Sequence, residues 1–241
     1  MIKKIIQSLI NLFGFKIIKI KEKKFREFDQ ILKKVLKKNK NIIFDVGANK
    51  GQSLDRFDQL FNNTIFYSFE PSFEAFKILK SKYGNSNNIK LFNTALGLEK
   101  KRKVFYEYKN NELSSFIKIK KKFEEKRKNI FVEVETIDSV FKKNCLKKIN
   151  LLKIDTQGYE ELILKGAKKL IAKQKIDLIE LEMILGDYYE KSSSFKKIED
   201  TLVSGGYKLL ALDRRLNIFE NKHFYFNALY ASQNIYKNLF N

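Results

Sequence analysis

The stretch at residues 42–53, IIFDVGANKGQS, decides the fold, because an apolar run stops at an acid and small residues follow at once. Residues 42–46 have the composition of a short buried strand, and residues 51–61 have the pattern of a helix. Gly47, Asn49 and Gly51 lie between them, and residues of these types tolerate the positive φ angles of a tight turn. A buried strand that turns directly into a helix is the first half of a β–α unit.

Strand and helix patterns alternate along the rest of the chain. Further strands are predicted at residues 64–70, 88–96, 103–108, 130–136, 148–155, 175–183, 207–213 and 224–232. Helices are predicted at residues 72–84, 136–144, 159–171 and 195–204. Nearly apolar strands separated by helices predict an α/β fold with a doubly wound, mostly parallel sheet. The last two strands have no helix between them, so we expect an antiparallel hairpin there.

Two segments lie outside this alternation. Residues 1–40 carry thirteen Lys and Arg against three acids, and we expect a helical extension there before a single domain over residues 41–241. Apolar side chains recur at helical spacing in residues 1–14, but polar residues interrupt them and no cleavage site follows, which argues against a signal peptide. This basic amphipathic helix is predicted to dock on its own domain, with peripheral contact to an anionic membrane as the alternative. The lysine-rich residues 109–129 are predicted to be a mobile excursion.

The composition limits the classes of function. The chain has 241 residues and one cysteine, Cys145, so it has no internal disulfide and a cytoplasmic location is expected. With His223 as the one histidine, the usual zinc sites are nearly excluded, whereas a magnesium ion bound by carboxylates is not. The formal net charge of +21 would suit a nucleic-acid partner. The heavy use of Lys, Asn, Ile and Phe, without Trp, favours compositional bias instead.

Ligands of such sheets bind beyond the carboxyl ends of the strands. The residues predicted at those ends are Asp45, Glu70, Asn93, Asp155 and Glu182. Four of these five side chains are acids, so the ligand is expected to carry positive charge or hydroxyl groups.

The turn after Asp45 does not match the known phosphate-binding loops. A dinucleotide loop needs G-x-G-x-x-G and a P-loop needs G-K-[ST], whereas residues 47–51 are GANKG. Phosphates would also lie beside the Asp45 carboxylate, at a cost of about 1 kcal/mol or more. S-adenosylmethionine fits better, because it has a positively charged sulfur, a ribose for Glu70 to bind and a carboxylate for the amides at the helix start.

Several motifs together resemble the FkbM family of S-adenosylmethionine-dependent methyltransferases. FDVGANKG at residues 44–51 resembles its cofactor loop, YSFEP at 67–71 its ribose-binding strand end, and NTALG at 93–97 its third-strand motif. LLKIDTQGYEELILKGA at 151–167 is close to the most distinctive segment of the family, K-I-D-V-E-G-x-E followed by L-x-G-A. The resemblance spans residues 41 to about 185. Thr156 and Gln157 depart from the usual Val-Glu, so no catalytic role is expected for Gln157.

The resemblance implies a class I, Rossmann-like sheet of seven strands, S-adenosylmethionine as the cofactor, and O-methylation of a saccharide or small-molecule hydroxyl, as in glycan modification. Asn49 stands where many methyltransferases have glycine. The residues expected to contact the cofactor are Asp45, Gly47, Ala48, Asn49, Gly51, Glu70, Pro71, Asn93 and Ala95.

A general base would help methyl transfer by removing the proton of the acceptor hydroxyl. Asp155 is the first candidate, and Glu182 on the adjacent strand is the second. Two carboxyl groups within a few ångströms would raise one pKa, or they would share a divalent metal ion, which we do not predict. His223 opens the last strand and is the third catalytic candidate.

The expected acceptor contacts are Ser114, Ser115 and Gly158. The two serines lie in NNELSSF, which resembles a small-hydroxyl motif of the family, and Gly158 leaves room beside Asp155. The alternative function is an RNA methyltransferase that binds nucleic acid through its basic surface, with Phe105 and Tyr106 among the stacking aromatic residues. A binding module without enzymatic activity is a third interpretation, and it would need no donor site.

Overall fold

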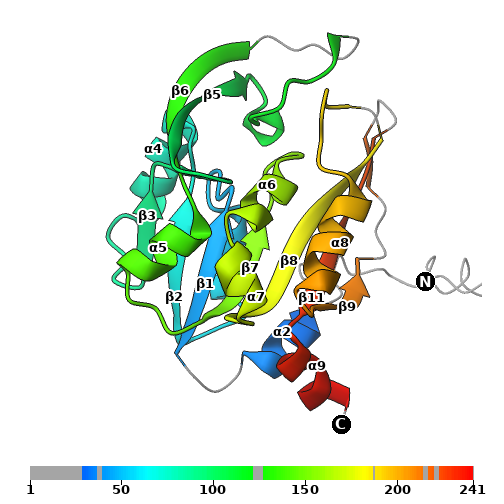
Figure 1. Cartoon of the computed structure of the whole chain (residues 1–241). Helices are drawn as coiled ribbons and strands as arrows, with labels where there is room; N and C mark the ends of the chain where they lie inside the picture. Colours follow the sequence, from blue (N-terminus) through cyan, green and yellow to red (C-terminus); the bar gives the residue numbers. More distant parts are fainter. Residues whose placement is uncertain are drawn as a thin grey trace, which may run out of the picture.

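A sheet of eight strands runs through the middle of the molecule, and helices cover both of its faces (Figure 1). The structure is a computed structural model that describes residues 29–36, 40–121, 127–186, 188–213, 217–219 and 223–240. The prediction of an amphipathic helix in residues 1–14 lies outside the described residues.

Five parallel strands form the centre of this sheet. In spatial order they are β3 (Ile89–Phe92), β2 (Thr64–Phe69), β1 (Asn41–Val46), β7 (Ile149–Ile154) and β8 (Ile176–Leu185). Neighbouring strands β1 and β7 are far apart in the chain, so the strand order reverses between them, and doubly wound sheets open a crevice at that point. Every residue of β7 is buried, because both faces are covered. The predicted α/β fold with a mostly parallel sheet is confirmed.

The C-terminal strands pair antiparallel, as predicted. Strand β11 (His223–Ala231) has β8 along one edge and both β9 (Lys208–Leu212) and β10 (Asn217–Phe219) along the other. The chain continues after β11 into helix α9 (Gln233–Phe240), which was not predicted. Ile235 and Tyr236 of α9 pack against the sheet.

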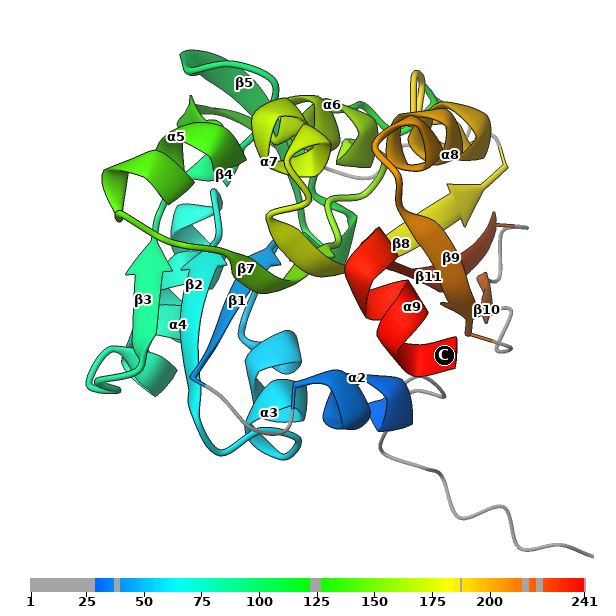
Figure 2. The ribbon, with the colours of Figure 1, turned by 60° about the horizontal axis from the view of Figure 1, so that its bottom comes forward.

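Each face of the sheet has its own helices and its own hydrophobic core (Figure 2). One face carries α5 (Ile137–Lys143), α6 (Glu160–Lys165), α7 (Lys168–Ala172) and α8 (Phe195–Ser204). The other carries α2 (Asp29–Val35), α3 (Gln52–Asp58), α4 (Phe73–Tyr83) and α9. Side chains alternate along a strand, so Phe44 enters the first core and its neighbour Ile43 enters the second.

Helix α2 packs into the second core, although it precedes the predicted start of the domain. Leu32 and Leu36 are buried there, and Asp29 forms an ion pair with Arg56 of α3. Residues 29–36 therefore contribute to the same core as the strands. In the part of the chain that the structure describes, no helix has the length and apolar composition that crossing a bilayer requires.

The predicted strand 88–96 is two strands. Strand β3 ends at Phe92, and β4 (Ala95–Leu96) belongs to a second, smaller sheet. The Asn93 side chain stabilises the break, because its amide donates to the carbonyl oxygens of Glu70 and Pro71 at 2.9 and 3.2 Å.

The predicted helix 159–171 is likewise divided into α6 and α7. At Gly166 a Cβ atom would lie 1.9 Å from the carbonyl oxygen of Gly97, so the two backbones are in contact there. Asp138 of α5 accepts hydrogen bonds from the amides of Lys169 and Leu170 and thereby starts the second helix.

The second sheet stands at one end of the main sheet (Figure 1). It has the order β4-β6-β5, in which β5 (Lys101–Tyr108) and β6 (Arg127–Glu135) form an antiparallel ribbon. Residues 109–121 follow β5 and include a short 3₁₀ helix, η1 (Asn111–Leu113).

Residues 109–121 are docked on the loop that follows β8. The Lys120 amide donates to the Tyr188 carbonyl, and the Glu190 amide donates to the Lys118 carbonyl, each at 2.8 Å. Tyr188 and Tyr189 also form a small hydrophobic cluster with Tyr108 and Ile119. We call residues 109–121 and 188–190 the roof. The predicted excursion covered residues 109–129: hydrogen bonds and apolar contacts dock residues 109–121, residues 127–129 begin β6, and residues 122–126 lie outside the described residues.

Candidate active site

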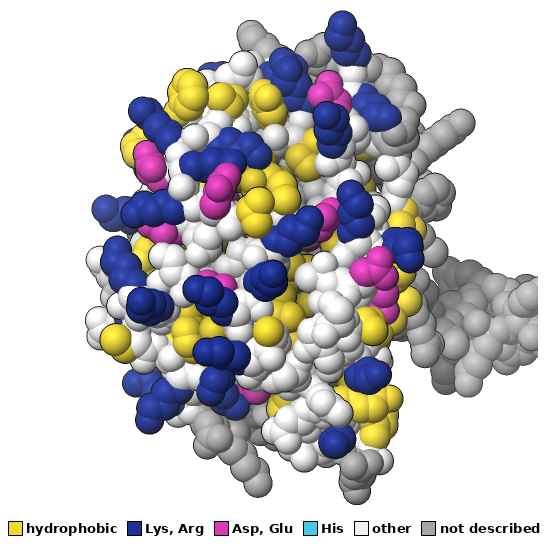
Figure 3. All heavy atoms as spheres, in the orientation of Figure 1, with side chains coloured by type: hydrophobic (Ala, Val, Ile, Leu, Met, Phe, Trp, Pro, Cys, Tyr) yellow, Lys and Arg dark blue, Asp and Glu magenta, His cyan; other side chains and the backbone are white. Residues whose placement is uncertain are grey.

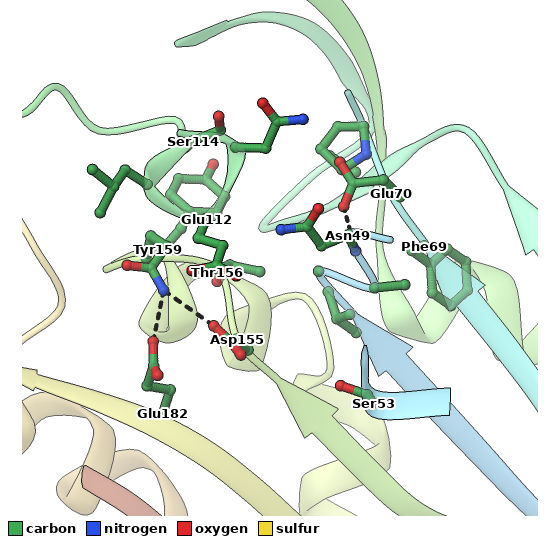
Figure 4. Close-up of a pocket in the computed structure, with 18 of the residues that line it drawn as sticks. Asn49, Ser53, Phe69, Glu70, Glu112, Ser114, Asp155, Thr156, Tyr159 and Glu182 are labelled. Carbon is green, nitrogen blue, oxygen red and sulfur yellow. Dashed lines mark hydrogen bonds between the residues drawn. The ribbon is translucent and has the colours of Figure 1, made fainter. Parts of the chain in front are cut away.

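A cavity of about 690 Å³ lies beyond the ends of β1, β2 and β7 and beneath the roof (Figure 4). This volume is in the range of small-molecule sites. Glu70 lies on one side of the cavity, and Asp155 and Glu182 lie on the other. The cavity therefore joins the predicted cofactor residues to the predicted catalytic carboxylates in one space.

The turn after β1 forms one wall of the cavity through Gly47, Ala48 and Asn49. Gly47 has φ +81°, and a Cβ atom on it would lie 1.9 Å from the carbonyl oxygen of Asp155, so only glycine lets β1 approach the loop after β7. Asn49 has φ +46°, as expected for an asparagine that stands in place of glycine. Gly51, with φ +96°, precedes α3 and does not line the cavity.

Glu70 lies at the end of β2 and faces the cavity with both oxygens held in place. Its Oε2 accepts from the Asn49 amide and its Oε1 from the Ser72 amide, each at 2.8 Å (Figure 4). Burial raises the pKa of Glu70 to about 7, although these two hydrogen bonds act in the opposite direction. A carboxylate has lone pairs to spare after two such bonds, so Glu70 can still accept hydrogen bonds from ligand hydroxyls.

Asp45 does not take the place that the sequence predicted. It is fully buried and does not line the cavity, and its Oδ1 lies 3.5 Å from Nζ of Lys153. The expectation that Asp45 meets a charged ligand directly is therefore wrong, because Lys153 is its cation. Burial raises the pKa of Asp45, and Lys153 opposes that rise.

Asp155 and Glu182 form a carboxyl pair at the far side of the cavity. Asp155 follows β7, whereas Glu182 lies inside β8, which continues to Leu185 beyond the predicted strand end. Burial raises the pKa of Glu182 well above its usual value, and the adjacent Asp155 carboxyl, which hydrogen-bonds to it, raises it further. Asp155 also has Lys153 Nζ at 3.3 Å from its Oδ2. The ammonium group thus favours the negative charge on Asp155, whereas burial and the neighbouring Asp155 favour the neutral form of Glu182.

Gln157 bridges this pair, although no role was expected for it. Its Nε2 donates to Glu182 Oε2 at 2.6 Å and to Asp155 Oδ1 at 3.2 Å (Figure 4). Its Oε1 accepts from the Tyr189 hydroxyl of the roof at 3.1 Å.

The predicted acceptor contacts have different positions. Ser114 lines the cavity, whereas Ser115 is buried behind it and donates to the Gln157 carbonyl at 2.9 Å. Gly158 does not open space for a substrate, since a Cβ atom on it would lie 3.0 Å from Cβ of Ser192. Ser115 and Gly158 therefore shape the loop after β7 rather than the cavity wall.

The remaining predicted residues are placed as follows. Pro71 and Ala95 line the cavity, and Asn93 supports the turn between them without lining it. His223 starts β11 and pairs with Phe219, and its side chain lies outside the described part of the chain. Among the described residues, no three His, Cys, Asp or Glu side chains gather in a way that could hold a metal ion.

The comparisons with known proteins agree with this geometry. The profile of the methyltransferase FkbM domain matches residues 45–209, which is more than half of the chain. The chain belongs to the FkbM methyltransferase family. It is an S-adenosylmethionine-dependent methyltransferase, and S-adenosylmethionine is its cofactor. No curated protein matches the chain.

Solved structures resemble this FkbM methyltransferase in fold at low sequence identity. A protein from Listeria monocytogenes described as an S-adenosylmethionine-dependent methyltransferase has a TM-score of 0.50 and 10% identity, over 85% of this chain and 97% of that chain. Precorrin-6y C5,15-methyltransferase from Geobacter metallireducens has a TM-score of 0.47 and 12% identity, with 85% and 87% covered. TrmK from M. capricolum, in complex with S-adenosylhomocysteine, has a TM-score of 0.46 and 17% identity, with 87% and 69% covered.

The residues of the FkbM domain fit S-adenosylmethionine. Glu70 offers carboxylate oxygens to a ribose, and Phe69, Pro71 and Leu96 offer apolar surface beside it for an adenine ring. Ser53 and the amides at the start of α3 lie on the same wall, where a carboxylate group is favoured.

Sequence reasoning missed several cavity residues besides Gln157. Lys153 had a visible signal, since it is a charged residue in the apolar strand INLLKI directly before Asp155. Arg56 had none: it lines the cavity from α3, and its guanidinium binds Glu180 of β8 at 2.6 Å as well as Asp29 of α2. Those partners come from distant parts of the sequence, so only the fold reveals them.

Proposed function

We propose that this FkbM methyltransferase transfers a methyl group to a hydroxyl of an uncharged small-molecule or saccharide acceptor. The observation that carries the proposal is the single cavity that joins Glu70 to the carboxyl pair of Asp155 and Glu182. The Glu70 side suits the donor, and the other side has the proton acceptor that a hydroxyl nucleophile needs.

The protonation of the pair assigns separate roles to its two acids. Bound S-adenosylmethionine supplies the methyl group as an electrophile on a positively charged sulfur. Asp155 would hold the acceptor hydroxyl and take its proton as the oxygen replaces the sulfur on the methyl carbon, with the neutral thioether as the leaving group. Asp155 suits this role because Lys153 favours its charged form, whereas burial and Asp155 raise the pKa of Glu182.

The charges of the cavity wall support an uncharged acceptor. Glu112 of the roof, Asp155 and Glu182 bring carboxyl groups to the acceptor side. The two cationic residues of the wall are already engaged, since Lys153 has Asp45 and Asp155 as partners and Arg56 has Asp29 and Glu180. Among the described residues that line the cavity, a phosphate or carboxylate on the acceptor would therefore meet negative charge while both cations already have acidic partners.

The neutral part of the wall also suits a sugar. Phe105, Phe116 and Tyr159 supply aromatic surface to the cavity, while Asn110 and Asn111 of the roof supply amide groups. A ring with apolar C–H faces and several hydroxyls can use both kinds of contact.

The basic surface gives no comparable support for RNA as the acceptor. Lys and Arg side chains are spread over the face in Figure 3 among acidic and apolar ones, without gathering into a groove. Such spacing is typical of a solvated, lysine-rich surface. The face in Figure 3 therefore gives no argument for a nucleic-acid acceptor.

A methyl-transfer assay tests the proposal. Purified protein and S-adenosylmethionine with a labelled methyl group are incubated with neutral sugars, the corresponding sugar phosphates and RNA. We expect transfer to a neutral sugar or a similar polyol, and little or none to its phosphorylated form. Transfer to RNA with steep salt dependence would instead favour the nucleic-acid alternative.

The variant Asp155→Asn tests the proton acceptor in the same assay. We expect turnover to fall about 10²-fold or more while donor binding is kept, because the amide cannot take the hydroxyl proton. Asp200→Asn, on the exposed face of α8, is the matched control and should leave turnover unchanged. Unchanged turnover in Asp155→Asn would remove Asp155 from the reaction.

A further inference from the structure

Gln157 is the residue on which the carboxyl pair and the roof converge. Its backbone has φ +56°, and Gly158 after it has φ +96°, so the chain bends sharply and turns the Gln157 side chain back toward the sheet. Left-handed backbone is uncommon outside glycine and is unfavourable by about 1 kcal/mol or more. The Ser115 hydroxyl of the roof binds the Gln157 carbonyl and stabilises this bend.

The amide group of Gln157 has the bonding capacity that a two-carboxyl site needs. An amide nitrogen carries two hydrogens, and here one is directed to Glu182 and the other to Asp155. The Tyr189 hydroxyl contacts Oε1 of the same amide and also the Leu113 carbonyl oxygen. The nitrogen faces the acids, and exchanging it with the oxygen would remove both hydrogen bonds that it donates to them.

We propose that Gln157 is a positioning residue that holds Asp155 and Glu182 as a pair sharing one proton, with the proton on Glu182 and the negative charge on Asp155. The use of the pair in hydroxyl methylation rests on the proposed function. The existence of the pair does not, because it needs no acceptor.

The charged groups around the pair agree with this placement of the proton. Lys153 of β7 faces Asp155, and Asp45 of β1 lies on the other side of that ammonium group. Glu160 of α6 adds negative charge near Glu182, and Tyr189 of the roof is a buried neutral phenol. Glu182 is thus partly buried with acids on several sides, and Lys153, which also lowers the pKa of Glu182, lies in direct contact with Asp155.

A neutral amide suits this position better than an acid would. Gln157 donates to both carboxyl groups at any pH and adds no charge. A glutamate of the same shape would lose the two donated hydrogens and would place another negative charge against Glu182 and Asp155. The residue that departs from the usual family motif is, on this view, the one that holds the two carboxyl groups together without adding a further charge.

Carboxyl NMR on the full-length protein tests the proposal without an acceptor. Protein with ¹³C-labelled glutamate and aspartate carboxyl groups is titrated with pH, and the two signals are assigned by their loss in Glu182→Gln and Asp155→Asn. The wild type should keep Glu182 protonated and Asp155 ionised at neutral pH. Gln157→Met retains the size of the side chain and removes its donors.

We expect Gln157→Met to move both titrations to higher pH by about one unit or more, because hydrogen bonds to the charged forms are lost. Gln157→Glu should move them further, since it adds a charge. Gln174 provides matched controls: it also has a positive φ, +52°, and a bridging amide that binds the Gly205 carbonyl and the Gln233 amide, but it lies outside the cavity. Gln174→Met and Gln174→Glu should leave both titrations unchanged.

Three results would overturn the proposal. They are two ionised carboxyl groups in the wild type at neutral pH, a Gln157→Met titration that coincides with the wild type, and an equal shift in the Gln174 variants. If the Gln157 variants do not fold, the side-chain ¹⁵N–¹H signals of Gln157 in the wild type decide the question. They should move with the Glu182 titration, and signals that ignore it would contradict the bridge.

Failure of the proposed function would look different. A wild-type protein with the expected carboxyl titrations but without transfer to any hydroxyl would overturn the acceptor class and leave the pair in place.

Discussion

The two halves of the cavity are built in different ways. The donor half consists of the turn after β1, the end of β2 and strand β4, so its residues follow one another between positions 46 and 96. The acceptor half combines the loop after β7, the middle of β8 and the roof, which are separated by long stretches of chain. Local sequence shapes the first half, whereas contacts between distant segments shape the second.

This difference has a consequence for how each half tolerates change. In the donor half, backbone amides hold Glu70, so the geometry depends on backbone conformation. In the acceptor half, side chains hold one another, as Gln157 does with Asp155, Glu182 and Tyr189. Substitutions in the donor half should therefore act mainly on folding and donor affinity, and those in the acceptor half on protonation and turnover.

The largest effect is expected where the two halves touch, at Gly47. Gly47→Ala places a Cβ atom 1.9 Å from the Asp155 carbonyl oxygen in a left-handed conformation, so the turn must shift. We expect a loss of about 4 kcal/mol in the free energy of unfolding, at the upper end of single substitutions. Denaturant unfolding of the variant measures it.

Gly206→Ala is the matched control for this substitution. Gly206 has nearly the same φ, +82°, but a Cβ atom there would meet only the Gln174 side chain, at 3.2 Å. It should cost about 1–2 kcal/mol, the penalty of left-handed backbone alone. Equal losses in the two variants would mean that close approach between the halves is not what requires Gly47. Aggregation of Gly47→Ala beside a folded Gly206→Ala would be the extreme form of the expected result.

The same difference explains how much the sequence could predict. Asn49 and Glu70 follow predicted strands within a few residues, so their placement beside each other needed only the rule that ligands bind at strand ends. Asp45 obeys that rule in sequence, yet its side chain is fully buried and pairs with Lys153, which is distant in the sequence. The parallel sheet was predictable because every central strand is apolar along its length.

The acceptor half was predictable only in its acids. Asp155 and Glu182 were expected to be close. The bridging amide of Gln157, however, depends on a left-handed backbone bend that the local sequence does not predict. The roof depends on Tyr189 and Ile119, which pair as neighbours across a gap of about seventy residues. Periodicity within a segment carries no information about such pairings.

The next largest effect is on donor affinity, and it compares one acid from the donor half with one from the acceptor half. Glu70→Ala should weaken binding of S-adenosylmethionine by about 1.5–3 kcal/mol, or roughly 10- to 100-fold, because hydrogen bonds to a charged group are lost. Glu112→Ala, in the roof, should change donor affinity less than about twofold, since Glu112 belongs to the acceptor half. Titration calorimetry below the unfolding temperature measures both.

Glu74→Ala, on the exposed start of α4, controls for the loss of a nearby negative charge and should bind the donor as the wild type does. A wild-type affinity in Glu70→Ala would place the donor elsewhere in the cavity. An equal loss in Glu112→Ala would contradict the division into two halves.

A smaller effect concerns Glu160, which folds the loop of the acceptor half. Its Oε1 accepts from the Thr156 amide, the Thr156 hydroxyl and the Gly158 amide, and burial raises its pKa from 4.5 to about 7. An acid whose pKa is raised by folding keeps its proton up to a higher pH in the folded state than in the unfolded state. The folded protein therefore loses stability as pH rises from about 4.5 through 7.

Glu160→Gln should remove this part of the pH dependence. Relative to the wild type, the variant should gain about 1–2 kcal/mol in the free energy of unfolding between pH 5 and pH 8. Urea unfolding at both pH values measures the change. Glu161→Gln, in the same turn, is the control: it also removes an acid, but not the buried Glu160 whose pKa is raised. A difference between Glu160→Gln and the wild type that does not vary with pH would show that Glu160 is ionised in the folded protein throughout this range.

The smallest effect is expected at Tyr189, which joins the roof to the carboxyl pair. Tyr189→Phe removes the hydroxyl whose single hydrogen is shared between the Leu113 carbonyl oxygen at 3.0 Å and Gln157 Oε1 at 3.1 Å. We expect a loss of about 1 kcal/mol in the free energy of unfolding, typical of one buried hydrogen bond. Tyr207→Phe is the matched control, because the Tyr207 hydroxyl donates to the Ile176 carbonyl at 2.8 Å away from the cavity.

The two variants should differ in which backbone amides lose protection from hydrogen exchange. In Tyr189→Phe, amide hydrogen exchange should accelerate in residues 110–119 of the roof, because the hydroxyl is one of the contacts that hold this segment closed. Tyr207→Phe should leave those amides as protected as in the wild type, even if it costs as much stability. Donor affinity should remain unchanged in both, since neither hydroxyl belongs to the donor half. Faster exchange of the turn after β1 in Tyr189→Phe would show that the two halves are coupled, and the roof would then influence donor binding as well as the acceptor.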